Sequence, residues 1–336
     1  QPRSRGLGDV YKRQVLFVIP WAHHWIIGTT DTPYEQSLDT PAATGADIDY
    51  VIEHANQVLA DPLTRDDVIG VYAGLRPLLQ PVTRDGQETA STKVSREHTV
   101  MEPVPGLVSI AGGKLTTYRI MAQDAVDLAL GEEEAQKRPS ITDRTLLHGA
   151  DGVFGLRARI PLLLEELRAG SQDPEIWTEQ RLNDLIARYG SDLHAVLALI
   201  QEDPSLERPL EGAPVHLRAE IVHACRAEGA LHLEDLLDTR TRLTYSAPHH
   251  GDAAVDEIAD LAAAELGWDG QRRDREVEAY RSRSAAEDAA ARTEDDPAAE
   301  HARESAEPVV EGLRVRTVHG DDQQGASDRD ADTIGD

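Results

Sequence analysis

The 336-residue sequence predicts an α/β domain followed by an all-α C-terminal domain. Two runs of β-forming residues lie near the beginning, at 15–21 and 25–31. A short apolar run at 107–111 leads through two glycines into a helical pattern, a combination typical of α/β folds. Beyond residue 131 the apolar residues recur with helical period. Runs of strands followed by runs of helices indicate two domains of different class.

The first elements are a leader, a hairpin and a helix. Residues 1–14 show neither strand alternation nor helical period and do not begin with Met, so we interpret them as a non-native or disordered leader. The runs VLFVIPW (15–21) and WIIGTTD (25–31) predict a β-hairpin. Residues 46–60 place their apolar side chains on one face and predict a helix, which ends before Pro62.

Two further strands are predicted at 68–79 and at 92–103. They are followed by the segment 107–130, in which LVSIA predicts a strand, Gly112-Gly113 a tight turn and the remainder a helix. The helix would turn Ile120, Met121, Ala125 and Leu128 inward. A strand–Gly–Gly–helix unit favours a parallel sheet with a ligand at the carboxyl end of the strand, and residues 15–131 form the predicted α/β domain.

The second half of the sequence is predicted to be a helical domain over 140–283. The last part of the sequence, 284–336, is acidic and poor in large apolar side chains, so we expect a disordered tail there. Periodicity with Pro or Gly punctuation predicts the helices of this domain at 157–169, 177–189, 192–201, 214–228 and 252–266.

Composition excludes several functions. The net charge is −27 and aromatic residues make up 4%, which argues against nucleic-acid binding. The single cysteine, Cys225, cannot form an intramolecular disulfide and indicates a small helical residue in a reducing compartment. No metal site is expected, because the pairs His23-His24 and His249-His250 would point apart in extended backbone. We expect a cytoplasmic protein.

Three positions are candidates for chemistry. The Gly112-Gly113 turn would let the backbone approach a flat ligand, and the helix after Lys114 would direct free N–H groups at an anion. Arg76 stands at the end of an apolar run, and Arg96 interrupts another strand. An arginine can hold a phosphate with two parallel hydrogen bonds, although each of these arginines alone is more often structural.

Four blocks together resemble the FAD-dependent glycerol-3-phosphate dehydrogenases. The resemblance extends from about residue 15 to about residue 283, and the helical segment 217–243 shares it. It implies an incomplete FAD-linked reductase domain of the D-amino-acid-oxidase-like kind, followed by the helical domain. The blocks are IIGTTD (26–31), AGLRPL (73–78), SREHTV (95–100) and GGKLTTYR (112–119).

The resemblance also implies an activity. This family oxidises sn-glycerol 3-phosphate to dihydroxyacetone phosphate by hydride transfer to FAD, and passes the electrons to quinone. It implies that Arg76 and Arg96 bind the substrate near its phosphate, and that Lys114 contacts both substrate and flavin as the candidate catalytic residue. Peripheral association with the inner face of the plasma membrane is compatible with this role. The residues implied to contact FAD are Gly112, Gly113, Lys114, Leu115 and Thr116.

One departure from the family keeps alternatives open. The GxGxxG turn that holds the FAD pyrophosphate is not found after any predicted strand, and the spacing at Gly6-x-Gly8 does not supply it. No general base can be assigned, and His98 is better explained as a structural histidine. A non-catalytic, acidic helical interaction module and an O2-using glycerol-3-phosphate oxidase are the competing interpretations.

Overall fold

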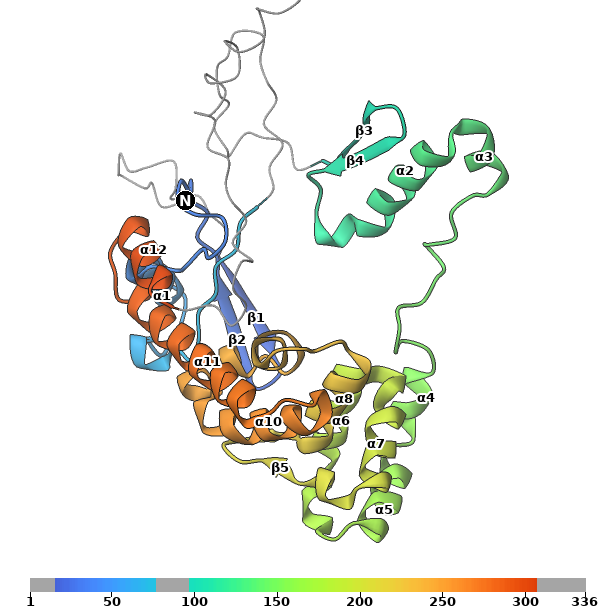
Figure 1. The fold of residues 1–336 in the computed structure, drawn as a ribbon, viewed down its shortest axis with the longest axis vertical. Coiled ribbons are helices and arrows are strands. Elements are labelled where there is room, and N and C mark those ends of the chain that lie inside the picture. The colour runs from blue at the N-terminus through green and yellow to red at the C-terminus, as the bar shows by residue number, and fades with distance from the viewer. Residues whose placement is uncertain (1–15, 77–96, 307–336) are drawn as a thin grey trace, which may run out of the picture. The chain divides into compact units, whose positions relative to one another are not determined.

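The computed structural model describes residues 16–76 and 97–306, and the leader 1–14 lies outside this range. The described chain is mostly helical, with three two-stranded sheets, β1–β2, β3–β4 and β5–β6, of which the first two are antiparallel. Helices make up most of the ribbon (Figure 1). It divides into two compact units, and each is described by itself. Unit 1 comprises the described parts of 1–74, 211–213 and 224–336, and unit 2 those of 75–210 and 214–223.

Unit 1 begins with the predicted hairpin, formed by β1 (Phe17–Trp21) and β2 (His24–Gly28). Helix α1 follows it, begins with a capping box from Thr44 and ends four residues before the predicted end. Apart from the short η2, the other helices of the unit come from the C-terminal part of the chain. Its elements beyond the hairpin are α1 (Gly45–Asn56), η2 (Arg65–Asp67), η8 (Asp235–Arg240), α9 (Leu243–Ser246), η9 (Pro248–Gly251), α10 (Asp252–Leu266), α11 (Gly270–Ala290) and α12 (Asp296–Glu304).

Residues near the beginning of the sequence pack against its C-terminal helices within unit 1. The backbone N–H of Ser37 donates to Glu300 Oε1 at 2.6 Å, and that of Gly45 donates to the carbonyl oxygen of Thr293 at 2.7 Å. The guanidinium of Arg242 lies over the Trp21 ring. The units therefore differ from the predicted domains, because residues 16–74 join the end of the chain and not residues 97–131.

Unit 2 contains a second hairpin and a group of helices. Strands β3 (Thr99–Val104) and β4 (Leu107–Ala111) pair antiparallel, with an irregularity between Met101 and Val104. The remaining elements of the unit are η4 (Leu115–Thr117), α2 (Tyr118–Leu130), α3 (Glu132–Lys137), α4 (Val153–Ala158), α5 (Ile160–Gly170), η5 (Pro174–Ile176), α6 (Glu179–Tyr189), η6 (Gly190–Asp192), α7 (Leu193–Glu202), η7 (Pro204–Glu207) and β5 (Pro209–Leu210), and β6 (Ala213–Leu217) and α8 (Arg218–Ala227) extend beyond it.

Local sequence explains why these helices begin and end where they do. The Thr178 side chain accepts a hydrogen bond from the Arg181 backbone at the start of α6, and Gly190 ends this helix with a positive φ. The apolar face of α6 then packs into a core that includes Trp177, which is 1% exposed. The other fully or nearly buried members of this core are Leu156, Ile160, Leu182, Leu185, Ile186, Leu193, Leu197 and Leu217.

Three predictions about the fold are corrected. Residues 68–76 form no strand, although this part of 68–79 was predicted to be one; residues 77–96 lie outside the described range. The described partner of β4 is the antiparallel β3, so the predicted parallel sheet around 107–111 is not confirmed. The helical structure does not end at residue 283, because α11 continues to Ala290 and α12 follows it.

The helices beyond residue 283 pack through small residues, which a count of large apolar side chains does not detect. Small residues can be buried in helices without large apolar side chains, and Ala286, Ala290 and Ala299 are each less than 5% exposed. Glu287 also joins α11 to α12 through its ion pair with Arg303. The expectation of a disordered tail is therefore wrong for 284–306, whereas 307–336 lie outside the described residues.

Candidate functional site

The Gly-Gly turn lies between β4 and α2, as the sequence predicted. Gly112 and Gly113 have φ of 76° and 84°, a region that side-chain-bearing residues rarely adopt. Lys114 returns to extended backbone, and η4 leads into α2. The turn therefore places residues 114–116 at the beginning of a helical segment, where backbone N–H groups favour an anion.

Gly113 is required by its own surroundings. A Cβ built at this position would lie 2.5 Å from the Met121 sulfur and 3.2 Å from the His98 Cβ. Both distances are shorter than ordinary van der Waals contact. The sequence suggested that glycine here serves the approach of a ligand, and the structure adds that it allows α2 to pack beside the residue preceding β3.

Lys114, Leu115 and Thr116 are exposed, and Leu115 is 88% exposed. The Thr117 hydroxyl donates to the carbonyl oxygen of Lys114 at 3.0 Å, which stabilises the start of the helical segment. The three side chains are thus available to a ligand or to another polypeptide.

His98 has a structural contact. Its Nε2 lies 2.6 Å from Asp124 Oδ2 on α2, and its side chain is 19% exposed. This hydrogen bond joins the residue before β3 to the helix after β4, which is a structural contact for His98. Sequence reasoning did not identify Asp124, because its position 26 residues away is set by the fold.

Only one of the two candidate arginines lies within the described residues. Arg76 is exposed in the irregular segment 71–76, and Arg96 lies outside the described residues. The convergence of the two arginines on one phosphate therefore stays a prediction.

A buried ionic cluster in unit 2 centres on Glu220, which is fully buried. Its carboxylate accepts hydrogen bonds from Arg188 Nε at 2.7 Å, from the Tyr189 hydroxyl at 3.0 Å and from the Leu217 backbone at 2.8 Å. Burial alone would raise the pKa of Glu220, but the hydrogen bond and charge of His216, together with the charge of Arg188, lower it to about 2. This cluster joins α6 to the start of α8 and has the character of a structural network.

Unit 1 contains a similar cluster around Glu276, which is also fully buried. Its carboxylate accepts a hydrogen bond from the Leu233 backbone at 2.9 Å and contacts His232 Nδ1 at 2.9 Å and Arg272 Nη2 at 2.5 Å. Elsewhere in unit 1, burial and the charge of Glu265 raise the pKa of the Cys225 thiol to about 11, which favours the protonated thiol at neutral pH.

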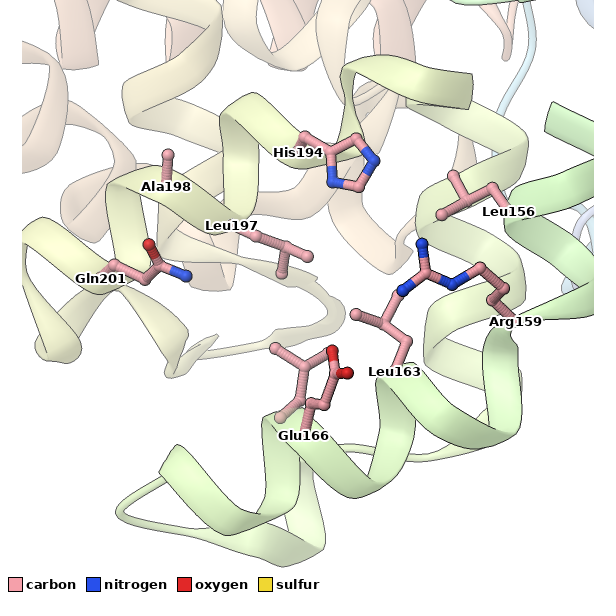
Figure 2. A pocket seen from close by; sticks show the side chains of 9 residues that line it. Leu156, Arg159, Leu163, Glu166, His194, Leu197, Ala198 and Gln201 are labelled. Atoms are coloured by element: carbon pink, nitrogen blue, oxygen red, sulfur yellow. The ribbon is translucent and has the colours of Figure 1, made fainter. Parts of the chain in front are cut away.

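A hollow of about 280 Å³ lies between the α4–α5 region and α7 (Figure 2). Leucines 156, 163, 167 and 197 line its apolar part, and Arg159, Glu166 and His194 stand around it (Figure 2). These three polar side chains are exposed and of mixed charge. None of the predicted site residues lines this hollow.

The described part of the chain contains neither a membrane-spanning helix nor a metal site. No helix there is both long and apolar enough to cross a membrane. Within residues 16–76 and 97–306, no group of three or more His, Cys, Asp or Glu side chains is arranged to hold a metal ion.

Comparison with known proteins first defines the class. Residues 140–273 match a family model described as the C-terminal domain of alpha-glycerophosphate oxidase. The helical part of the chain is thus similar to the C-terminal domain of that family.

Individual relatives show a more particular similarity. The chain is 46% identical over 310 residues to a glycerol-3-phosphate dehydrogenase of Mycobacterium leprae, and the match covers 91% of this chain and 51% of that protein. A glycerol-3-phosphate dehydrogenase of Synechocystis is 33% identical, over 79% of this chain and 46% of its own length. The resemblance predicted from the sequence is confirmed: the chain is related to the C-terminal part of the glycerol-3-phosphate dehydrogenases.

A solved structure agrees with this relationship. The glycerol-3-phosphate dehydrogenase of Bacillus halodurans, determined in complex with FAD, superposes with a TM-score of 0.55 at 26% identity. The superposition covers 77% of this chain and 48% of that protein. The chain therefore spans about half the length of the relatives that it matches.

Proposed function

We propose that this chain forms the C-terminal part of an enzyme that oxidises sn-glycerol 3-phosphate to dihydroxyacetone phosphate, with FAD as the hydride acceptor. The observation that carries the proposal is the 46% identity to a glycerol-3-phosphate dehydrogenase across 91% of the chain. The FAD complex of the Bacillus halodurans relative supports the choice of cofactor. The α/β part would then belong to an FAD-linked reductase domain of the D-amino-acid-oxidase-like kind.

The two arginines would bind the substrate. A phosphate monoester needs donors that can form two parallel hydrogen bonds, and the guanidinium groups of Arg76 and Arg96 can supply them. Exposure of Arg76 in an irregular segment is compatible with this role. These two side chains would hold the phosphate end of the substrate and so orient its C2 carbon.

The Gly-Gly turn would hold the flavin end of the site. When bound, FAD supplies a ring that accepts the hydride and becomes anionic. Gly112 and Gly113 form a turn without side chains, and residues 114–116 are exposed at the start of a helical segment, so they fit a flat ring of this kind. The ammonium group of Lys114 would stabilise negative charge that develops on the substrate oxygen or on the flavin.

The electron acceptor requires a choice between quinone and O2. The matched relatives named above are all dehydrogenases, whereas the matching family model carries the name of an oxidase. We favour quinone, with the protein in the cytoplasm and peripheral on the inner face of the plasma membrane. Comparing the rate of quinone reduction with the rate of hydrogen peroxide formation distinguishes the two acceptors, and dominant peroxide formation would favour the oxidase.

The function can be tested in a chimera. The part of the Mycobacterium leprae relative that this chain does not match is joined to residues 1–336, and the flavin absorbance is followed after addition of glycerol 3-phosphate. We expect bleaching of the flavin. A chimera that holds flavin but is not bleached by this substrate would contradict the proposal and would favour the non-catalytic interaction module.

Substitutions in the chimera test the site. Loss of one partner of a buried hydrogen-bonded charge pair costs about 2–5 kcal/mol. Because the bound substrate would bury the Arg76–phosphate pair, we expect Arg76→Ala to lower kcat/KM for glycerol 3-phosphate by roughly 30-fold or more. The loss with glycerol, which has no phosphate, should be smaller. Arg76→Lys should also impair catalysis, because an ammonium group lacks the planar fork. Arg138→Ala is the matched control, since Arg138 forms an exposed ion pair with Glu134. Equal losses on both substrates would assign Arg76 a structural role.

A further inference from the structure

His98 and Asp124 form a hydrogen-bonded pair beside the Gly-Gly turn. His98 Nε2 lies 2.6 Å from Asp124 Oδ2, and because a carboxylate only accepts hydrogen bonds, the imidazole is the donor. The pair joins the residue before β3 to the second turn of α2, and α2 runs beside the β3–β4 hairpin (Figure 1). The hydrogen bond therefore connects two elements that the turn separates along the chain.

The turn lies between two long-range contacts. On one side the pairing of β3 with β4 extends to Thr99 and Ala111, directly before the turn. On the other side the hydrogen bond between His98 and Asp124 holds α2 to the residue that precedes β3. Residues 112–123 therefore form a closed loop whose geometry depends on this bond.

His98 also packs directly against the turn. A Cβ built at Gly113 would lie 3.2 Å from the His98 Cβ, which is closer than ordinary van der Waals contact. Lys114 follows in extended backbone and is exposed. Its carbonyl oxygen accepts a hydrogen bond from the Thr117 hydroxyl, which is a contact between close neighbours. The position of His98 thus constrains the direction in which Lys114 leaves β4.

The exposure of the pair favours a local role over a contribution to global stability. The side chains of His98 and Asp124 are 19% and 45% exposed. Water screens the charges of such a pair, so it adds little to the free energy of unfolding. Its hydrogen bond nevertheless keeps its direction, and so it fixes local geometry.

We propose that His98 and Asp124 are positioning residues, which hold the Gly-Gly turn so that the Lys114 ammonium group faces the reacting end of the site. The inference rests on the proposed function, because that function assigns Lys114 to the substrate and the flavin. In this role neither His98 nor Asp124 touches substrate or FAD. A contact that served only the fold would change the stability of unit 2 and leave catalysis by the folded enzyme unaltered.

The first measurement uses the full chain without FAD or substrate. We expect His98→Ala and Asp124→Ala each to speed amide hydrogen exchange of residues 112–117 by roughly tenfold, because the turn opens more often. The Tm should fall by no more than about 4 °C, since a pair of this exposure contributes little. The double substitution should be no faster than either single one, because both remove the same bond.

The matched control is His148→Ala. His148 Nε2 lies 2.7 Å from Asp192 Oδ2, so this is a histidine–aspartate pair of similar length in the same unit, outside β3, β4 and α2. His148→Ala should leave the exchange of residues 112–117 unchanged.

The second measurement uses the chimera described above. His98→Ala should lower kcat by about 10- to 100-fold, because a displaced Lys114 no longer faces the reacting atoms. The KM for glycerol 3-phosphate should stay within about threefold, since the arginines proposed to bind the phosphate are unaltered. His98→Gln retains an N–H donor of similar reach and should restore most of kcat.

Unchanged exchange of residues 112–117 in the two alanine variants would overturn the proposal. A kcat that His98→Ala leaves unaltered would also overturn it. The exchange measurement needs neither flavin nor substrate. If the unsubstituted chimera holds flavin but is not bleached by glycerol 3-phosphate, the proposed function fails, and the exchange result still decides whether His98 and Asp124 hold the turn.

Discussion

Gly113 is constrained both by its backbone and by its neighbours. Its φ of 84° costs energy for any residue with a side chain, and a Cβ would lie 2.5 Å from the Met121 sulfur. Gly106 has the same φ, but nothing lies within 4 Å of a Cβ there. Comparing substitutions at the two glycines therefore separates the free-energy cost of a strained backbone from that of a steric clash.

We expect Gly113→Val to lower the local stability of the β4–α2 region by about 2–5 kcal/mol, the sum of a strained backbone and an overpacked contact. Gly106→Val should cost about 1–2 kcal/mol, since it carries the backbone cost alone. Amide hydrogen exchange of residues 118–130 measures both. Equal effects of the two substitutions would mean that Met121 moves aside without cost.

Glu220 is a fully buried charged residue of unit 2. In Glu220→Gln the partly buried Arg188 loses its fully buried counter-charge, and because Arg188 is 22% exposed we expect a loss of about 2–4 kcal/mol at pH 7, somewhat below that for a fully buried pair. Urea unfolding measures the free energy of unfolding of each variant. Glu165→Gln is the control, because Glu165 is exposed on α5. A loss below 1 kcal/mol would show that the cluster is dispensable.

The same residue predicts a pH dependence. The pKa of Glu220 is about 2 in the folded chain and 4.5 in the unfolded chain, so its stabilisation is present above pH 4.5 and is lost as the pH falls toward 2. The shift corresponds to a loss on the order of 3 kcal/mol over this window. The stability difference between wild type and Glu220→Gln should therefore narrow between pH 4.5 and 2.5. A constant difference would contradict the depressed pKa.

At the scale of elements, the end of α11 and all of α12 contribute to unit 1. Arg283 forms ion pairs with Glu234 and Asp238 at 2.9 and 2.7 Å, and Glu287 pairs with Arg283 and Arg303. Burial lowers the pKa of Arg283, but the hydrogen bond and charge of Asp238 outweigh this, so the net shift is upward. These contacts hold α11 to η8 and to α12.

Removal of residues 284–336 should therefore destabilise the chain. The truncation removes three buried alanines and the carboxylate partner of Arg283 on the same helix, for which we expect a loss of about 2–4 kcal/mol and a Tm lower by roughly 5–15 °C. A chain ending at Ala306 keeps all of these contacts and is the matched control. Differential scanning calorimetry compares the two, and equal Tm values would show that the ordered segment 284–306 adds no stability.

At the scale of the whole molecule, the exposed apolar residues are not evenly distributed. Strand β1 is apolar and exposed, and α2 exposes Ile120, Val126 and Leu128, although the sequence predicted that Ile120 and Leu128 point inward. The helical part that matches the oxidase C-terminal domain, in contrast, contains most of the buried core. The chain thus combines a domain with its own core and segments whose apolar sides lack cover within the described residues.

The sequence alone determined the local elements and the resemblance to the glycerol-3-phosphate dehydrogenases. The helix 252–266 was predicted with the bounds that α10 has, and the hairpin and the strand–Gly–Gly–helix unit were confirmed. Helical period, turn residues and caps are local signals that are read over a few neighbouring residues. The resemblance of the GGKLTTYR block and its companions required no fold at all.

Only the tertiary structure decided which segments meet. Residues 214–217 were predicted to be helical, but they pair with β5 and form β6. The antiparallel partner of β4, the contact of Gly113 with Met121 and the four donors around Glu220 are likewise set by the fold. Strand partners, the burial of small residues and the pairing of buried charges depend on contacts between distant parts of the chain, which a local pattern does not encode.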